Sequence, residues 1–298
     1  MTALPRDVAL IERLAGAFRR SPQQLNARHE SDAELVRLGD ADTVLALTTD
    51  AIAEEIERGL YVDPHLIGWM TVMACASDLA AVGAAPLGIL VSETLPDDLA
   101  AEALGQLQQG ISDACDATGL CVLGGDTNSG PRLHMGACAA GIVTGPGTLT
   151  RLGARPGDGL YSSGPLGLGA AYALLQLSGM TPPVYRPIAR VREGQLLRGL
   201  ASCAMDTSDG ALVTLDELSR LNGVGFVLER EVAEVLHPAA RAVAQTAGLP
   251  AWTLLAGPHG EFELLFTVPD EHAADLTSRA AAAGWEPLKL GRVVREPG

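Results

Sequence analysis

The stretch Gly145–Gly159, GPGTLTRLGARPGDG, divides the chain into two halves of nearly equal length. Glycine and proline interrupt helices and strands, so this composition indicates a linker between two folded units. On both sides of it, apolar patterns typical of helices and of strands mix without strict alternation. We therefore expect an α+β protein with two domains, residues 1–148 and 149–298, rather than one doubly wound sheet.

The half before the linker contains clear helix and strand patterns. Leu99–Thr118 carries apolar residues at helical spacing, and Gly119 follows where a left-handed cap would end the helix. Leu60–Val82 is a second expected helix, and residues 1–20 have the pattern of an amphipathic one. Strands are expected at Thr43–Thr49, at Leu120–Leu123, which should be buried, and at His134–Thr144.

After the linker the pattern starts again. A strand at Leu160–Ser163 precedes a glycine-rich turn, GPLGLG, and a helix that runs to Leu177. The further expected helices are Ala189–Ser202, Leu212–Leu221, Pro238–Ala247 and Glu271–Ala283. The further expected strands are Gly225–Leu228, Phe262–Val268 and Leu288–Val294.

Composition excludes several classes of protein. A formal charge of −15 repels nucleic acid, so we expect no DNA or RNA partner. No run of about 18 apolar residues occurs, and the N-terminus lacks the features of a secretory signal, so we expect neither a membrane span nor export. The five cysteines form no C-x-x-C pair and indicate a reduced, cytoplasmic protein.

The chain has a single lysine, Lys289, and therefore no Gly-Lys-Ser/Thr phosphate loop. The chemistry lies instead in short acidic motifs, which include TTD at 48–50, GGD at 124–126 and DTSDG at 206–210. Taken singly, an aspartate beside glycine or serine is ordinary turn and capping chemistry. Together, carboxylates gathered at strand ends are costly unless a cation neutralises them, and Mg²⁺ prefers such oxygen ligands together with substrate phosphates. The pattern predicts Mg–ATP binding without a lysine.

These motifs occur in a recognisable order: TTD, SDLAAVGAAP, GGDT, RLGARPGD, GPLG, DTSDG and FELLF. Over roughly Asp32 to Val268 the sequence resembles the thiamine-monophosphate kinase branch of the aminoimidazole ribonucleotide synthetase superfamily. The resemblance implies an N-terminal α/β domain that pairs across a homodimer through an intersubunit sheet, a C-terminal α+β domain, and ATP held between them through several Mg²⁺ ions. The residues Met135–Val143 would suit such a sheet.

The resemblance also implies roles for particular residues. The metal ligands would be Asp32, Asp50, Asp78, Asp126, Asp206 and Asp209, of which Asp126 and Asp209 would carry catalysis. The nucleotide site would be completed by Thr48, Thr49, Gly125, Arg151 and Ser208. Outside the resemblance, His259 in the segment PHGEFELLF is either a surface-loop histidine or a contact to the acceptor near Glu261. No protein nucleophile is needed, because an oxygen of the acceptor attacks the γ-phosphorus directly.

Three departures from the family pattern affect the prediction. The Gly-Asp-Asp motif of the kinases becomes SDA at 31–33, so one acid is missing. The His-Phe pair that follows TTD is absent from AIAEEIERGLY, and Gly-Gly-Glu-Asp-Tyr-Glu-Leu becomes PHGEFEL at 258–264. The departures therefore leave ATP binding better supported than thiamine phosphate as the acceptor, which the sequence does not identify, and we expect Asp209 to matter more than Asp32.

Three functions are compatible with these residues. The first is a kinase that transfers the γ-phosphate of ATP to a small phosphorylated or carboxylated metabolite. The second is an ATP-dependent synthetase or cyclo-ligase of the aminoimidazole ribonucleotide synthetase type. The third is a degenerate nucleotide-binding regulator, which the reduced Gly-Asp-Asp motif favours, whereas the complete DTSDG and GGD motifs favour an enzyme.

Overall fold

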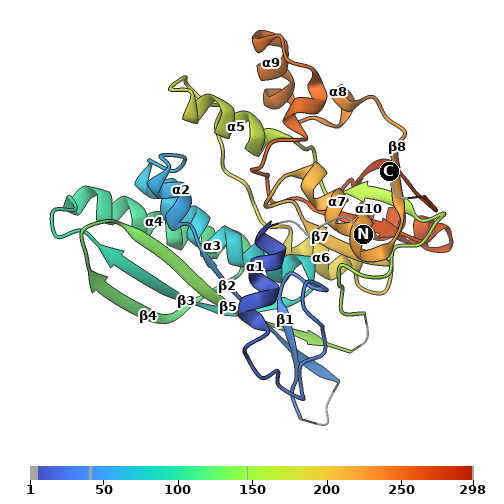
Figure 1. Cartoon of the computed structure of the whole chain (residues 1–298), viewed down its shortest axis with the longest axis horizontal. Helices are drawn as coiled ribbons and strands as arrows, with labels where there is room; N and C mark the ends of the chain where they lie inside the picture. Colours follow the sequence, from blue (N-terminus) through green and yellow to red (C-terminus); the bar gives the residue numbers. More distant parts are fainter. Residues whose placement is uncertain (1–5, 40–41, 146, 297–298) are drawn as a thin grey trace.

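A computed structural model of the protein describes residues 6–39, 42–145 and 147–296. Its strands form two five-stranded sheets, one on each side of the predicted linker, with helices between and around them (Figure 1). This arrangement confirms the α+β class expected from the mixed patterns. None of the helices in the described ranges is both long and apolar enough to cross a membrane.

The first sheet has the strand order β1-β2-β5-β3-β4. Its members are β1 (Glu34–Arg37), β2 (Thr43–Ala51), β3 (Ala85–Leu95), β4 (Val122–Ser129) and β5 (His134–Thr144). Neighbouring strands are antiparallel except β3 and β4, which are parallel and are joined by a helical crossover. The helices of this half are α1 (Arg6–Ala15), α2 (Ala53–Glu57), α3 (Pro64–Ala81) and α4 (Ala101–Thr118).

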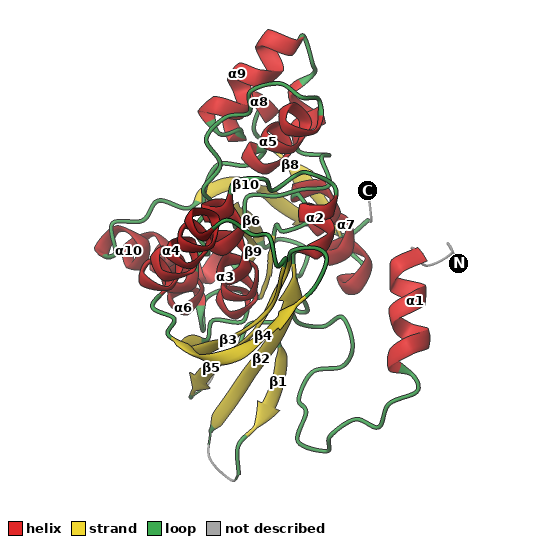
Figure 2. Ribbon diagram, turned by 90° about the vertical axis from the view of Figure 1, so that its left-hand side faces the viewer, coloured by secondary structure: helices red, strands yellow, loops and turns green. Residues whose placement is uncertain are grey.

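One face of the first sheet is covered by helices and the other is open (Figure 2). On β5 the small and apolar residues Met135, Ala137 and Ala139 are buried, while His134 and Cys138 between them are exposed. This period of two is that of a strand with one covered face. Leu90 is exposed on the open side, and three further large apolar residues of β3 and β4, Leu87, Val122 and Leu123, are also exposed although a monomer would usually bury them.

Helix α3 forms the centre of the molecule. Asp63 caps its start by accepting a hydrogen bond from the backbone N–H of His65 at 3.1 Å, and Pro64 occupies the first turn. Nearly all of its side chains are buried, and its core cluster joins residues of the first sheet to Phe266 and Leu264 of the second. One hydrophobic cluster therefore spans both halves, so the two sheets are packed through a common core.

The second sheet is antiparallel throughout, with the order β7-β9-β6-β10-β8. Its strands are β6 (Gly159–Ser162), β7 (Cys203–Asp206), β8 (Gly225–Leu228), β9 (Leu264–Val268) and β10 (Leu288–Val294). Its helices are α5 (Leu168–Leu177), α6 (Val191–Leu197), α7 (Ala211–Asn222), α8 (Val232–Val235), α9 (Pro238–Ala247) and α10 (Ala273–Ala282), with short 3₁₀ turns at Ala251–Leu254 and Asp270–His272. The group α5, α8 and α9 projects at the top of Figure 1 and shares a second apolar cluster with β6, β9 and β10.

Several expectations from the sequence need correction. The strand predicted at Leu120–Leu123 is instead Val122–Ser129 and is exposed, because it forms the edge of the sheet. The helix predicted at Ala189–Ser202 is confined to Val191–Leu197. Strands β1, β3 and β7 were not anticipated, and residues 1–5 of the predicted N-terminal helix lie outside the described part of the chain.

Candidate active site

A cavity of about 400 Å³ lies between the two halves of the chain. Both halves contribute to its walls, which combine acidic, hydroxyl and aromatic side chains with one arginine. The lining residues are Asp32, Thr48, Thr49, Asp50, Ala51, Ile52, Glu55, Tyr61, Ala74, Asp78, Arg151, Asp206, Ser208, Asp209, Pro258, His259 and Phe262. We call this cavity the groove.

Three of the predicted metal ligands converge at one end of the groove. Carboxylate oxygens of Asp32, Asp78 and Asp206 all lie within 4.8 Å of one another. They come from distant parts of the chain: the loop before β1, the last turn of α3 and the end of β7. The fold therefore brings together three acids that neither sequence distance nor local structure would join.

Two of these carboxylates have oxygens without a hydrogen-bond partner in the described part of the chain, and such oxygens are available to bind a cation. Oδ2 of Asp32 and Oδ2 of Asp206 are buried and have no hydrogen-bond partner within the described part of the chain. Burial, and then the charge of Asp32, raise the pKa of Asp206 to about 7, and burial and the neighbouring aspartates raise the pKa of Asp78 as well. Burial and the nearby negative charges thus disfavour the ionised forms of Asp78 and Asp206. Their hard oxygen ligands fit a divalent cation such as Mg²⁺.

Arg151 provides a fixed positive charge beside the cluster. Its guanidinium donates two hydrogen bonds to Oδ1 of Asp32, from Nη2 at 2.8 Å and from Nε at 3.2 Å, and its backbone N–H bonds the carbonyl of Glu30. Burial acts to lower the pKa of Arg151, but the charge and hydrogen bonds of Asp32 raise it overall. A single arginine leaves the three carboxylates only partly neutralised.

The DTSDG motif forms the wall contributed by the second half. Asp206 ends β7, and its Oδ1 accepts a hydrogen bond from Oγ of Ser208 at 3.0 Å. Gly210 precedes α7 with a φ of 89°, and a Cβ at this position would lie 2.1 Å from the carbonyl oxygen of Gly257. The glycine is therefore needed for the close turn that presents Ser208 and Asp209 to the groove.

The GGD motif lies elsewhere. Asp126 is exposed within β4, the edge strand, and its carboxylate accepts a hydrogen bond from Asn128 at 2.7 Å. The expectation that it follows the end of a strand, as Asp50 nearly does, is wrong because β4 continues to Ser129. Close approach of a nucleotide is not the only reason for a glycine at position 125. A Cβ there would lie 2.0 Å from the carbonyl oxygen of Val91 on β3, so the packing of the sheet also requires glycine.

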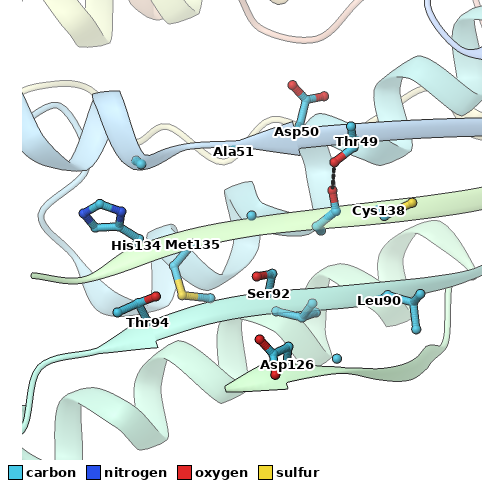
Figure 3. Close-up of a pocket in the computed structure, with 15 residues that line it drawn as sticks. Thr49, Asp50, Ala51, Leu90, Ser92, Thr94, Asp126, His134, Met135 and Cys138 are labelled. Carbon is cyan, nitrogen blue, oxygen red and sulfur yellow. Dashed lines mark hydrogen bonds between the residues drawn. The ribbon is translucent and has the colours of Figure 1, made fainter. Parts of the chain in front are cut away.

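The register of the sheet separates Asp126 from the groove. Asp50 pairs with Ala137 on the helix-covered face, whereas Asp126 pairs with Ser92 on the open face. Three strand spacings of about 4.8 Å put β4 roughly 14 Å from β2. Asp126 lines a second cavity of about 600 Å³ on the open face, which meets the groove at Thr49–Ala51 (Figure 3).

The two predicted acceptor residues differ in access. His259 lines the groove, is nearly buried, and lies 3.2 Å through its Nε2 from the hydroxyl of Tyr61. Burial lowers the pKa of His259 to about 4, so its imidazole is neutral near pH 7. Glu261 is buried beside the start of α5, where its carboxylate accepts weak hydrogen bonds of 3.4 Å from Gly169 N–H and from Thr207. It is absent from the groove wall.

Sequence reasoning missed part of the groove. Glu55, Tyr61 and Phe262 all line it, and none of them was assigned a role in the site from the sequence. Phe262 has a φ of 60°, an uncommon left-handed conformation for a bulky residue and one that clusters at functional sites. The signal in the sequence was indirect: these residues lie in the two segments where it departs from the family pattern.

Comparison with known proteins defines the class first. Residues 30–143 match the family described as AIR synthase related protein, N-terminal domain. A crystal structure of tt0281 from Thermus thermophilus superposes with a TM-score of 0.84 at 30% identity, covering 100% of this chain and 96% of that one. AaThiL complexed with AMPPCP and TMP shares the fold, with a TM-score of 0.79 at 22% identity, covering 100% and 94%.

The sequence relatives then define the family within this class. The thiamine-monophosphate kinase of Escherichia coli O157:H7 is 30% identical over 275 residues, which cover 89% of this chain and 83% of the relative. The enzyme of the same name from Pyrococcus abyssi is 29% identical over 277 residues, covering 89% and 86%. The chain belongs to the thiamine-monophosphate kinase family and is an ATP-dependent kinase.

Proposed function

We propose that this kinase transfers the γ-phosphate of ATP, with Mg²⁺, to the phosphate of a small metabolite, and that thiamine monophosphate is the first acceptor to test. The observation that carries the proposal is the cluster of Asp32, Asp78 and Asp206, whose unsatisfied oxygens face a groove between the two halves. The related AaThiL is described as a complex with AMPPCP, an ATP analogue, and TMP.

In this proposal, the side chains of the groove have separate roles in binding the metal and the phosphates. Magnesium, when bound by the aspartates, would neutralise phosphate charge that the chain itself does not. Arg151, fixed by Asp32, would orient a phosphate oxygen, and Ser208 at the start of α7 would donate a hydrogen bond to another. Asp209 would complete the ligand set on the side of the second sheet. Positioning and electrostatics are what phosphoryl transfer requires of a protein.

A homodimer that pairs through the open face of the first sheet belongs to this proposal. Asp126 lies on that face, on the side of the sheet opposite to Asp50, so one chain does not bring its carboxylate to its own cluster. The face also exposes Leu90, and Leu123 and Val122 on the neighbouring edge strand are exposed as well. A second copy packed there would bury this apolar surface and would carry its Asp126 toward the partner's nucleotide site. The division into residues 1–148 and 149–298 assigns this dimer surface to the first domain.

Product analysis tests the function. The protein is incubated with ATP, Mg²⁺ and thiamine monophosphate, and the products are separated by liquid chromatography with mass detection. The proposal predicts thiamine diphosphate and ADP in equal amounts. Free phosphate without a phosphorylated acceptor would indicate ligase-type or unproductive turnover, and ATP binding without any turnover would indicate a regulator. A panel of other phosphate monoesters identifies the acceptor if thiamine monophosphate is inert.

A further inference from the structure

The DTSDG turn, residues 206–210, is docked on the segment of chain that leads into β9. The backbone N–H of Thr207 donates a hydrogen bond to the carbonyl of Glu263 at 2.8 Å, and the N–H of Glu263 donates to Oγ1 of Thr207 at 3.0 Å. The N–H of Gly260 donates to the carbonyl of Ser208 at 2.9 Å. The place of the turn therefore depends on the place of this segment.

The side chain of Glu263 connects the same segment to the start of α6. Its carboxylate is buried and accepts two hydrogen bonds from the guanidinium of Arg190, one from Nε at 2.8 Å and one from Nη2. It also accepts a hydrogen bond from the hydroxyl of Ser163, directly after β6. Paired hydrogen bonds from a planar guanidinium define both distance and orientation. The position of Glu263 therefore follows that of Arg190.

Arg190 belongs to a stretch of chain that is attached to α3. The N–H of Ala189 lies 3.4 Å from Sδ of Met73, and Nε1 of Trp69 donates a hydrogen bond to the carbonyl of Pro187 at 2.7 Å. Both Trp69 and Met73 are buried residues of α3. Helix α3 thus holds the residues that immediately precede Arg190.

Helix α6 lies beside α3, whose last turn also carries Asp78 (Figure 1 and Figure 2). At Gly194 of α6 the two helices are so close that a Cβ would lie 2.0 Å from the carbonyl oxygen of Ala80. In a close-packed interior, a displacement of one element is transmitted to its neighbours. Helix α6 therefore contacts the turn that bears Asp78 and, through Arg190 at its start, the segment on which Asp206 depends.

We propose that Arg190 is a positioning residue of the kinase, which through Glu263 sets the distance between Asp206 on the DTSDG turn and Asp78 on α3. Both aspartates belong to the carboxylate cluster, whose oxygens must stay within reach of one cation. Phosphoryl transfer depends on placement, so a shift of about 1 Å in one ligand is costly. The inference rests on the proposed function for the role of the metal, but the placement of the turn can be measured without metal or turnover.

Hydrogen exchange followed by mass spectrometry, in EDTA and without ATP, tests the placement. Arg190→Lys keeps the positive charge but loses the paired contact, so the amides of residues 206–210 should exchange at least about tenfold faster, the scale of one charge-assisted hydrogen bond. This increase should exceed that of the central strand β5, which reports on global unfolding.

Arg292→Lys is the matched control for this experiment. It makes the same change in the Arg292–Glu229 ion pair, on the opposite side of the second sheet from β7. The exchange of the DTSDG turn should remain as in the wild type. If Arg190→Lys does not fold, Trp69→Phe takes its place, because it keeps a ring in α3 but removes the hydrogen bond to Pro187. The turn should then exchange several-fold faster.

Steady-state kinetics supplies a second readout. In Arg190→Lys, kcat should fall by about tenfold or more, and the KM for ATP should rise by a smaller factor, because transfer requires closer placement than binding does. A loss of stability alone would leave both parameters of the folded enzyme unchanged well below the Tm.

The outcomes separate this inference from the proposed function. A DTSDG turn that exchanges as in the wild type, or that accelerates no more than β5, would overturn the role of Arg190, and so would an unchanged kcat. Faster exchange of the turn, in a protein whose wild type phosphorylates no acceptor, would uphold the positioning and refute the proposed function. Wild-type turnover together with an unchanged turn in the variant would do the reverse.

Discussion

Asp206 and Asp126 are both motif aspartates, yet the fold treats them in opposite ways. Asp206 is buried at the end of β7, an edge strand whose residues are all covered, and it lies close to two other carboxylates. One of its oxygens lacks a partner within the described residues. Asp126 is exposed on an edge strand and bonds to the nearby Asn128. In a single chain, burial and the charge of Asp32 disfavour the ionised form of Asp206, whereas Asp126 lies away from the cluster.

This difference shows which part of the site one chain completes by itself. The cluster around Asp206 joins both halves of a single chain, so its metal chemistry should be intrinsic to the monomer fold. Asp126 lies on the open face of the sheet, so in the proposed dimer it would act at the site of a second copy packed against that face. Four experiments can test the two sides of this contrast.

Removal of divalent metal should have the largest effect. Without a cation, the phosphates of ATP would face the three carboxylates of the cluster, and like charges at such short range repel strongly. We expect ATP affinity to fall by at least about two orders of magnitude. Isothermal titration with Mg²⁺ and with EDTA measures it, and equal affinities would refute a metal-bridged site.

Removal of the charge of Asp206 should nearly stop turnover. Asp206→Asn keeps the side-chain shape but removes one ligand from the cluster, so kcat should fall by about 10²- to 10³-fold, the cost of one transition-state electrostatic contact. Asp216→Asn, an exposed change on the adjoining helix α7, is the matched control and should retain full activity. If Asp32→Asn proves more damaging than Asp209→Asn, the importance assigned to Asp209 from its complete motif is wrong.

Mixing two inactive variants should restore part of the activity. In a heterodimer of Asp126→Asn and Asp206→Asn chains, one of the two sites would contain both native aspartates if Asp126 acts on the partner. A statistical mixture after subunit exchange should then reach about a quarter of wild-type activity, because half of the dimers are mixed and each has one intact site. Either variant alone serves as the baseline. Activity that stays at the baseline would place both residues in the same chain's site.

The smallest effect concerns stability of the metal-free protein. The pKa of Asp206 is raised in the folded state from its ordinary value of 3.8 to about 7, so the folded chain binds a proton that the unfolded chain releases. The stability that this proton provides is present below about pH 4 and is lost as pH rises through 7. In EDTA the melting temperature should fall by a few degrees over this range. Asp206→Asn should flatten the slope, whereas Asp126→Asn should leave it unchanged.

Calorimetry across this pH range, repeated with Mg²⁺, gives the check. Bound cation stabilises the ionised carboxylates, so magnesium should abolish the decline between about pH 4 and 7. A wild-type profile in EDTA that is flat, or that rises with pH, would mean that the three acids do not repel one another in the folded chain.

The sequence determined a large part of this protein. Helices such as Ala101–Thr118 and Pro238–Ala247 and strands such as His134–Thr144 follow from local periodicity, which depends only on nearby residues. Capping and turn chemistry likewise indicated the end of α4 at Gly119 and the turn at Gly210. The order of the acidic motifs was enough to indicate the family and to nominate Asp32, Asp78 and Asp206. Aspartates are recognisable in a sequence as candidate metal ligands because their side chains are carboxylates.

Only the tertiary structure decided how these residues meet. The sequence contains no sign that β4 is an edge strand or that Asp126 lies on the opposite sheet face from Asp50, since pairing order and register arise from packing of distant segments. Nor does it show that Glu55 and Tyr61 come to lie opposite His259, which is about 200 residues further along the chain. Convergence in space depends on the common core that α3 builds between two sheets, and local sequence patterns do not determine that packing.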